Sequence, residues 1–332
     1  MQTLSKIDRL IGKHILWFVL GCLVLGVGLP DTFSVLVPVT PYLFAMMTFC
    51  NVLGCSFRQM GGVLLRPAPI LTVFFLLHVA MPLLCLGLCR LLFADAPLFT
   101  TGLVLQFVLP TAVATLMWVD IGRGNLPLCL SAVLLDTLLS PIIIPFSLKV
   151  FVGSLVEMDA MGMMRDLLGM VALPAALALA LHGIQGGRFA RVWKARLSPF
   201  AKLSMLAIIV SNATGVAPFL RNITSTLVLV IVVLMGLSIF SYFLGYLVAR
   251  HLLHLDFPSC QSMTLNTGLR NISAGAVLAA QYFPADVLFP VAFSPIFAQL
   301  SIAVAVKILR KTKAGQADQA AYDAARSEDT LL

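Results

Sequence analysis

Residues 98–121, LFTTGLVLQFVLPTAVATLMWVDI, form an apolar run that is interrupted at its centre by Leu109-Pro110-Thr111-Ala112. A helix needs about 20 apolar residues to cross the hydrocarbon core of a bilayer, so the length of this run predicts a membrane-spanning segment. Proline has no backbone N–H to donate, and Pro110 therefore predicts a break in that helix near the middle of the bilayer.

A second apolar run, residues 257–283, is interrupted in the corresponding place by Asn266-Thr267-Gly268-Leu269-Arg270-Asn271. Glycine with flanking asparagines favours an unwound turn. Unwound backbone at membrane depth is tolerated only where it is buried in protein or lines a cavity. Two interrupted helices at matching positions in the two halves of a chain are typical of a transporter binding site.

The composition excludes a soluble domain. Hydrophobic residues make up 60% of the 332 residues and charged residues 11%, and the mean hydropathy is +1.01, whereas soluble domains carry about 25% charged residues. The net charge of +8 is spread over short loops, where it orients the chain in the membrane, so we expect no nucleic-acid partner. The seven cysteines lack the spacing of metal ligands. We therefore expect them to pack as small apolar side chains and to form no metal site.

Ten apolar runs predict an all-α polytopic membrane protein. Cutting at charges and Pro-Gly clusters places its helices at 14–29, 39–57, 68–92, 98–121, 126–152, 163–184, 199–219, 224–251, 257–283 and 286–310. We expect residues 14–152 to form a first five-helix repeat and residues 153–310 to form a second. Because each repeat has an odd number of helices, the second is inverted in the membrane relative to the first. Residues 1–13 precede the first helix, which we expect to be retained rather than cleaved, and the polar tail 311–332 is expected to be mobile.

The loop charges predict that both termini are cytoplasmic, in a multi-pass protein of a bacterial inner membrane. The basic residues on the expected inner side are Lys6, Arg9, Lys13, Arg58, Arg66, Arg123, the cluster at 188–196, Arg250, Arg310, Lys311 and Lys313. The opposite ends carry few basic residues, namely Arg90 and Arg221.

Residues 110–145, PTAVATLMWVDIGRGNLPLCLSAVLLDTLLSPIIIP, resemble the fourth and fifth helices of the bile acid:sodium symporter family. CNVLGCSFRQM (Cys50 to Met60) and LNTGLRNISAGAVLAAQYF (Leu265 to Phe283) are similar to two further segments of that family. The resemblance covers nearly the whole chain. It implies a panel domain, from helices one, two, six and seven, packed on a core domain in which the two broken helices cross.

The same resemblance implies two sodium sites beside the crossing, but the matching side chains differ. The family's ligand positions fall on Thr115, Leu116, Cys129, Val133, Asn266, Arg270 and Leu77. Sodium needs several hard oxygen ligands, which leucine, valine, cysteine and arginine side chains do not supply. We therefore expect no cofactor and no pair of sodium ions; if sodium binds, its candidate ligands are Thr111, Thr115 and Asn266.

Arg270 is the strongest candidate functional residue, because a guanidinium within the bilayer is costly unless it faces a cavity or a partner. It either replaces the missing cation at the crossing or clamps an anionic substrate, aided by the positive ends of the half-helices. A third interpretation is a structural ion pair with Asp136, an acidic residue deep in the fifth helix.

Further polar residues near the breaks are candidates for lining a site. His78 and Asp136 are candidates for proton coupling, since histidine changes its charge near neutral pH. Candidate substrate-binding residues are Arg270, Asn266, Asn271, Thr111, Thr115, Gln106 and Ser273. The ordinary alternative for each is a packed side chain that forms hydrogen bonds with backbone groups left free at the breaks.

No motif of an enzyme is present, such as His-Glu-x-x-His or Gly-x-Ser-x-Gly, so we expect a transporter rather than an enzyme. The leading hypothesis is a carrier of a small organic anion, such as a carboxylate, with proton coupling or exchange. The alternatives are a sodium symporter with rebuilt sites and, with less support, a channel or sensor.

Overall fold

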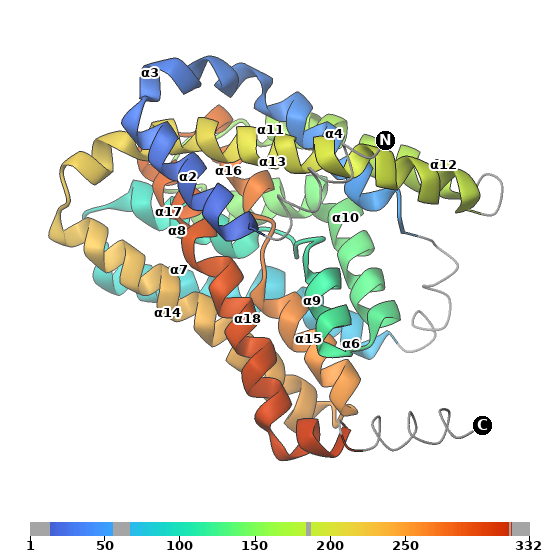
Figure 1. Cartoon of the computed structure of the whole chain (residues 1–332). Coiled ribbons are helices and arrows are strands. Elements are labelled where there is room, and N and C mark those ends of the chain that lie inside the picture. Colours follow the sequence, from blue (N-terminus) through green and yellow to red (C-terminus); the bar gives the residue numbers. More distant parts are fainter. Residues whose placement is uncertain (1–13, 56–66, 184–186, 319, 321–332) are drawn as a thin grey trace.

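The computed structural model describes residues 14–55, 67–183, 187–318 and 320. Within them the regular secondary structure is helical, apart from one isolated bridge, and short turns connect the helices (Figure 1). Seven of its helical segments are long and apolar enough to cross a membrane: Pro30–Val52, Ala68–Leu92, Leu126–Val152, Ala160–Gly183, Val192–Arg221, Ser225–Leu252 and Ala285–Lys311. Trp17–Gly28, Pro97–Val108 and Ile272–Tyr282 are shorter apolar helices. A polytopic helical membrane protein is thereby confirmed; the count of ten and the inverted repeats remain predictions.

One group of helices, here called the panel, packs around the long helix α13 (Arg188–Arg221). It also contains α2 (Ile15–Gly28), α3 (Pro30–Phe33), η1 (Ser34–Val39) and α4 (Thr40–Val52). Its remaining members are α11 (Ala160–Leu167), η4 (Leu168–Ala172) and α12 (Leu173–Gly183).

Two boundaries in the panel differ from the sequence predictions. Helix α13 begins at Arg188 rather than at residue 199, so the basic segment that was expected to precede this helix is part of it. The second crossing begins at Pro30 rather than at residue 39, since proline is well tolerated in the first turn of a helix. Residues 1–13, 56–66 and most of the tail lie outside the described residues, including the last two residues of the second expected helix.

The other helices, here called the core, surround the two interrupted segments. They are α6 (Ala68–Phe75), η3 (Leu76–Ala80) and α7 (Met81–Leu92), then α10 (Leu126–Val152), α14 (Ser225–Leu247), η6 (Val248–Leu252), α17 (Ala285–Phe293) and α18 (Pro295–Lys311). In the tail, residues 313–318 are helical, and the mobility of the tail stays a prediction.

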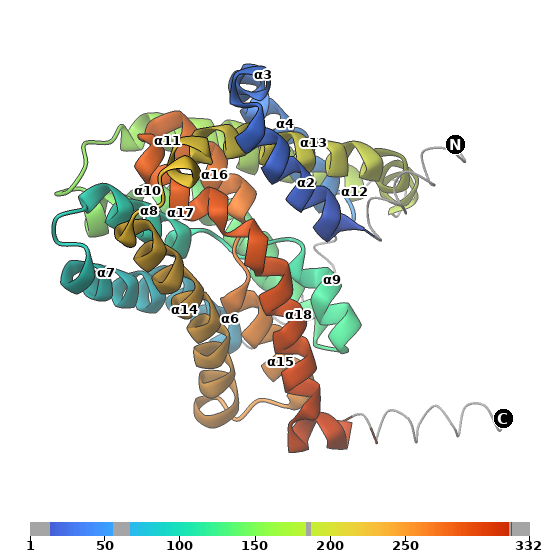
Figure 2. The ribbon, with the colours of Figure 1, turned by 60° about the vertical axis from the view of Figure 1, so that its left-hand side comes forward.

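Both predicted helix breaks are present. The first separates α8 (Pro97–Val108) from α9 (Thr115–Gly122), and the second separates α15 (Phe257–Gly268) from α16 (Ile272–Tyr282). Helix α15 continues to Gly268, so the second break is shorter than expected. Figure 2 shows α8 and α16 on one side of the crossing and α9 and α15 on the other.

The unwound segments pair with each other where they cross. Thr111 and Arg270 form an isolated antiparallel bridge. The N–H of Ala112 donates to the carbonyl of Leu269 at 3.1 Å, and the N–H of Asn271 donates to the carbonyl of Pro110 at 2.8 Å. Backbone groups freed from the helices therefore find partners in each other, as the membrane interior requires.

Candidate functional site

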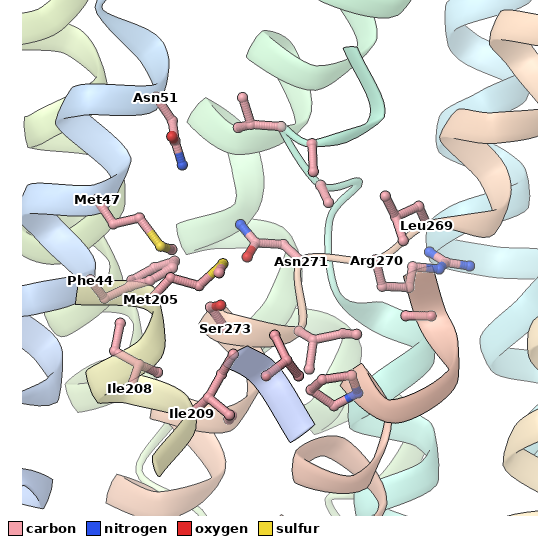
Figure 3. Close-up of a pocket in the computed structure, with 18 of the residues that line it drawn as sticks. Phe44, Met47, Asn51, Met205, Ile208, Ile209, Leu269, Arg270, Asn271 and Ser273 are labelled. Atoms are coloured by element: carbon pink, nitrogen blue, oxygen red, sulfur yellow. The ribbon is translucent and has the colours of Figure 1, made fainter. Parts of the chain in front are cut away.

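A cavity of about 170 Å³ lies between the panel and the crossing (Figure 3). The panel side of its wall is largely apolar and includes Phe44, Met47, Met205, Ile208 and Ile209. The core side includes both breaks and the start of α16, at residues 112–114 and 269–273. Residues of α10, α16, α17 and α18 complete it, namely Thr137, Ala276, Ala292, Pro295, Ala298 and Gln299. A concave, mostly apolar site with a few polar groups is typical of a binding site for a small molecule.

The N-terminal ends of two half-helices form part of the cavity wall. Helix α9 begins at Thr115, directly after the lining residues 112–114, and α16 begins at the lining residue Ile272. The N-terminus of a helix carries a partial positive charge, which favours an anion. The first N–H groups of α9 donate to the carbonyls of residues 112–114, so the attraction at this end comes from the helix dipole. The side chain of Asn271 caps α16 by accepting from the N–H of Ala274 at 3.3 Å.

Asn212 of α13 brings an unsatisfied side chain to the same cavity. It is 4% exposed, and in the part of the chain that the structure describes neither its Nδ2 nor its Oδ1 atom has a hydrogen-bond partner. Buried polar groups without partners are rare in folded proteins and call for an explanation. A polar ligand in this cavity would supply the missing partner.

Arg270 lies at the crossing with its guanidinium turned away from the cavity (Figure 3). Its Nη1 atom donates to the carbonyl of Leu77 at 3.3 Å and to the carbonyl of Leu109 at 3.2 Å. The guanidinium also lies 5.9 Å from the ring centroid of Phe107. In this conformation Arg270 stabilises the junction between η3 and the C-terminal end of α8, where the partial charge of the helix is negative.

An ion pair between Arg270 and Asp136, one of the three interpretations of Arg270, is absent from the described residues. Asp136 is fully buried and pairs with His78 instead, whose Nε2 atom lies 2.7 Å from Oδ1 of Asp136. The other carboxylate oxygen of Asp136 accepts from the backbone N–H of Thr111 at 2.7 Å. Asp136 thus connects the third helix directly to the first break.

Thr111 and Asn266 join the two broken helices behind the cavity. The hydroxyl of Thr111 lies 3.3 Å from Oδ1 of Asn266, to which it donates, and Nδ2 of Asn266 donates to the carbonyl of Ser262 at 2.8 Å. These two side chains therefore hold the crossing and do not line the cavity.

Several positions that the resemblance assigned to sodium ligands have mostly apolar surroundings. Cys129 and Val133 are buried in one cluster with Leu265 and Leu269, and Leu116 packs against it. The hydroxyl of Thr115 is buried without a partner among the described residues. Across those same residues, no group of three His, Cys, Asp or Glu side chains could hold a metal ion.

The remaining predicted site residues divide between two places. Arg270, Asn271 and Ser273 line the main cavity, and Figure 3 shows the side chain of Asn271 directed towards Met47 and Met205. Gln106 lies apart from it, in a small chamber of about 20 Å³ shared with Tyr242 and Arg270. The prediction from sequence missed Thr48, Asn51, Asn212 and Gln299, which also line the cavity; isolated polar residues within apolar helices were the signal that could have identified them.

Comparison with known proteins identifies the family. Residues 40–223 match the model of the Sodium Bile acid symporter family. The uncharacterized protein YbaS of Bacillus subtilis is 34% identical over 281 residues, which cover 85% of this chain and 92% of that protein.

Two further relatives carry names that mention sodium. The probable sodium/metabolite cotransporter BASS1 of Arabidopsis thaliana chloroplasts is 25% identical, over 81% of this chain and 65% of that protein. The uncharacterized sodium-dependent transporter YocS of Bacillus subtilis is 22% identical, over 91% and 92%. The chain belongs to the Sodium Bile acid symporter family, and it is accordingly a multi-pass membrane transporter of a small molecule rather than an enzyme.

Proposed function

We propose that this member of the family is a secondary transporter that carries a small organic anion, carboxylate-like in its charged group, by alternating access. The proposal rests on the cavity, because the positive ends of α9 and α16 lie in its wall and the opposite wall is largely apolar. An anion with an apolar body fits both surfaces, because the half-helix ends favour negative charge.

Within this proposal, Arg270 acts as a fixed cation at the crossing. Its guanidinium donates to the carbonyls of Leu77 and Leu109, two oxygens that a bound cation would otherwise attract. The orientation of the side chain away from the cavity favours this role over that of an anion clamp. A permanent positive charge at this place would hold the crossing without a sodium ion.

The coupling ion in this proposal is a proton carried by the His78–Asp136 pair. The two side chains are 7% and 0% exposed and lie 2.7 Å apart. Protonation of the carboxylate weakens its acceptance of the Thr111 N–H, since a neutral carboxyl group is a poorer acceptor than a carboxylate. Proton binding would therefore act on the break that lines the cavity.

A sodium-coupled symporter is the second candidate. Two relatives are named for sodium, and the buried hydroxyl of Thr115 has no partner within the described residues, so it is available as one oxygen ligand. Thr111 and Asn266 would have to release their present hydrogen bonds to complete such a site.

Uptake into proteoliposomes that contain the full chain tests the proposal. A panel of radiolabelled small carboxylates is offered with a proton gradient alone, with a sodium gradient alone, or with unlabelled substrate inside and no gradient. We expect saturable uptake that responds to the proton gradient or to internal substrate. Uptake that requires sodium would establish the second candidate, and an unsaturable ohmic current would show a channel and overturn the carrier hypothesis.

A further inference from the structure

The two ends of the interface between panel and core differ. The cavity reaches the side where α2 begins and α4 ends, through the lining residues Ile15 and Asn51. A second hollow of about 130 Å³ continues it along α13, sharing Met47, Asn51 and Met205 with the cavity and reaching Lys194 and Lys202. The loop charges predict that this side is cytoplasmic.

Polar contacts connect panel and core at the opposite end. Asp166 of α11 belongs to the panel, and its Oδ2 atom accepts hydrogen bonds from Nε2 of Gln281 and from the hydroxyl of Tyr282, both at 2.5 Å. Gln281 and Tyr282 form the end of α16, in the core, and Figures 1 and 2 both place α11 next to α16. The hydrogen bonds of Arg270, Asp136 and Asn266, by contrast, stay within the core.

An aromatic cluster lies at that same end, where α13 finishes. Phe219 of α13 lies 6.1 Å from Phe99 of α8 and 5.2 Å from Phe289 of α17, measured between ring centroids. Helix α17 begins only three residues after Tyr282. Aromatic packing and charge-assisted hydrogen bonds therefore both link panel and core on the side away from the cavity mouth.

We infer that Asp166, Gln281 and Tyr282 form an outer latch, which with the Phe219 cluster closes the outer route and leaves the cavity open to the cytoplasm. This inference rests on the proposed transport by alternating access. The carboxylate of Asp166 is the part of the latch that must be released before the panel and the core can separate at this end, because it accepts both hydrogen bonds.

The test measures accessibility and does not require a known substrate. The cavity residue Ser273 is replaced by Ser273→Cys as a reporter, and the full chain is labelled with a membrane-impermeant thiol reagent in vesicles of either orientation. The parent chain, with its seven native cysteines, measures background labelling. We expect labelling of the reporter from the cytoplasmic face and little from the outer face.

Adding Asp166→Asn should raise the rate of labelling from the outer face about tenfold or more, because it removes the negative charge that strengthens both hydrogen bonds of the latch and so shifts the two-state equilibrium. Tyr282→Phe, which removes one donor, should act in the same direction. Asp286→Asn is the matched control, because Asp286 lies at the same end, in the first turn of α17, and has no part in the latch. The latch would be overturned if the Ser273→Cys reporter alone were labelled equally from both faces, or if Asp166→Asn left its labelling unchanged. These labelling rates do not depend on which anion is carried, so a failure to transport any anion would be a separate result.

Discussion

Thr111 and Arg270 face each other across an antiparallel bridge, the point at which two broken helices cross. Thr111 donates its N–H to Asp136, and Arg270 donates to Leu77 and Leu109. Two buried polar groups therefore support the crossing, the His78–Asp136 pair on one side of the bridge and the Arg270 guanidinium on the other.

Arg270→Gln should lower uptake by about tenfold or more, because the carbonyls of Leu77 and Leu109 lose a charged donor, an interaction that is typically worth about 1.5–3 kcal/mol. Combining it with Asn266→Glu introduces a carboxylate and removes the fixed cation, so the double variant should gain uptake that depends on sodium. The measurement is the initial rate of uptake with and without a sodium gradient. Absence of any sodium dependence in the double variant would argue against the fixed-cation role.

Asp136→Asn should abolish the response of uptake to a proton gradient while exchange of external for internal substrate continues. Asparagine has nearly the shape of aspartate but cannot take up a proton as a carboxylate does. Its amide oxygen can still accept a hydrogen bond from the N–H of Thr111. The comparison is uptake with and without a proton gradient, and Asp120→Asn on the exposed face of α9 serves as the control. A variant that kept its full response would show that Asp136 does not carry the coupled proton.

Some of these relationships follow from the sequence and others do not. Pro110 and the Asn-Gly-Asn pattern around Arg270 predicted both breaks, because the loss of a donor and the freedom of glycine act locally. The partner of Asp136 could not be predicted, since it depends on how the third and fifth helices are rotated towards each other, which is decided by packing. The sequence left a pair with Arg270 as one open interpretation, whereas in the fold Asp136 pairs with His78.

The panel side of the cavity was missed for a related reason. Asn51 and Asn212 are far apart in the chain and meet only because α4 and α13 pack side by side. Asn271 and Ser273 were found because they follow a break directly. Sequence therefore located the half of the site built from unwound backbone, but not the half built from helix faces.

Asn212→Ala should raise the KM for the transported anion about tenfold while leaving the Tm unchanged or slightly higher. Within the described residues both polar atoms of Asn212 are buried without a hydrogen-bond partner. Their removal therefore breaks no hydrogen bond seen there and relieves the cost of burying a polar group. Ser211→Ala is the control, because the Ser211 hydroxyl is likewise buried without a partner in that part of the chain but is not among the residues that line the cavity. Uptake kinetics and thermal unfolding in detergent give the two quantities, and an equal change of KM in both variants would rule out a direct role for Asn212.

Gly102→Ala should destabilise the protein by about 1–3 kcal/mol, the usual cost of overpacking a tight contact. A methyl group at Gly102 on α8 would collide with the backbone carbonyl of Val287 on α17, so the two helices would have to separate. Small residues allow such close approach between membrane helices. Gly87→Ala on α7 is the matched control, since a methyl group there meets no atom within 4 Å and alanine favours the helix. Thermal unfolding of the purified protein should show a lower Tm for Gly102→Ala and an equal or higher Tm for Gly87→Ala. Equal Tm values for the two variants would contradict the close packing of α8 on α17, which positions the first break beside the cavity.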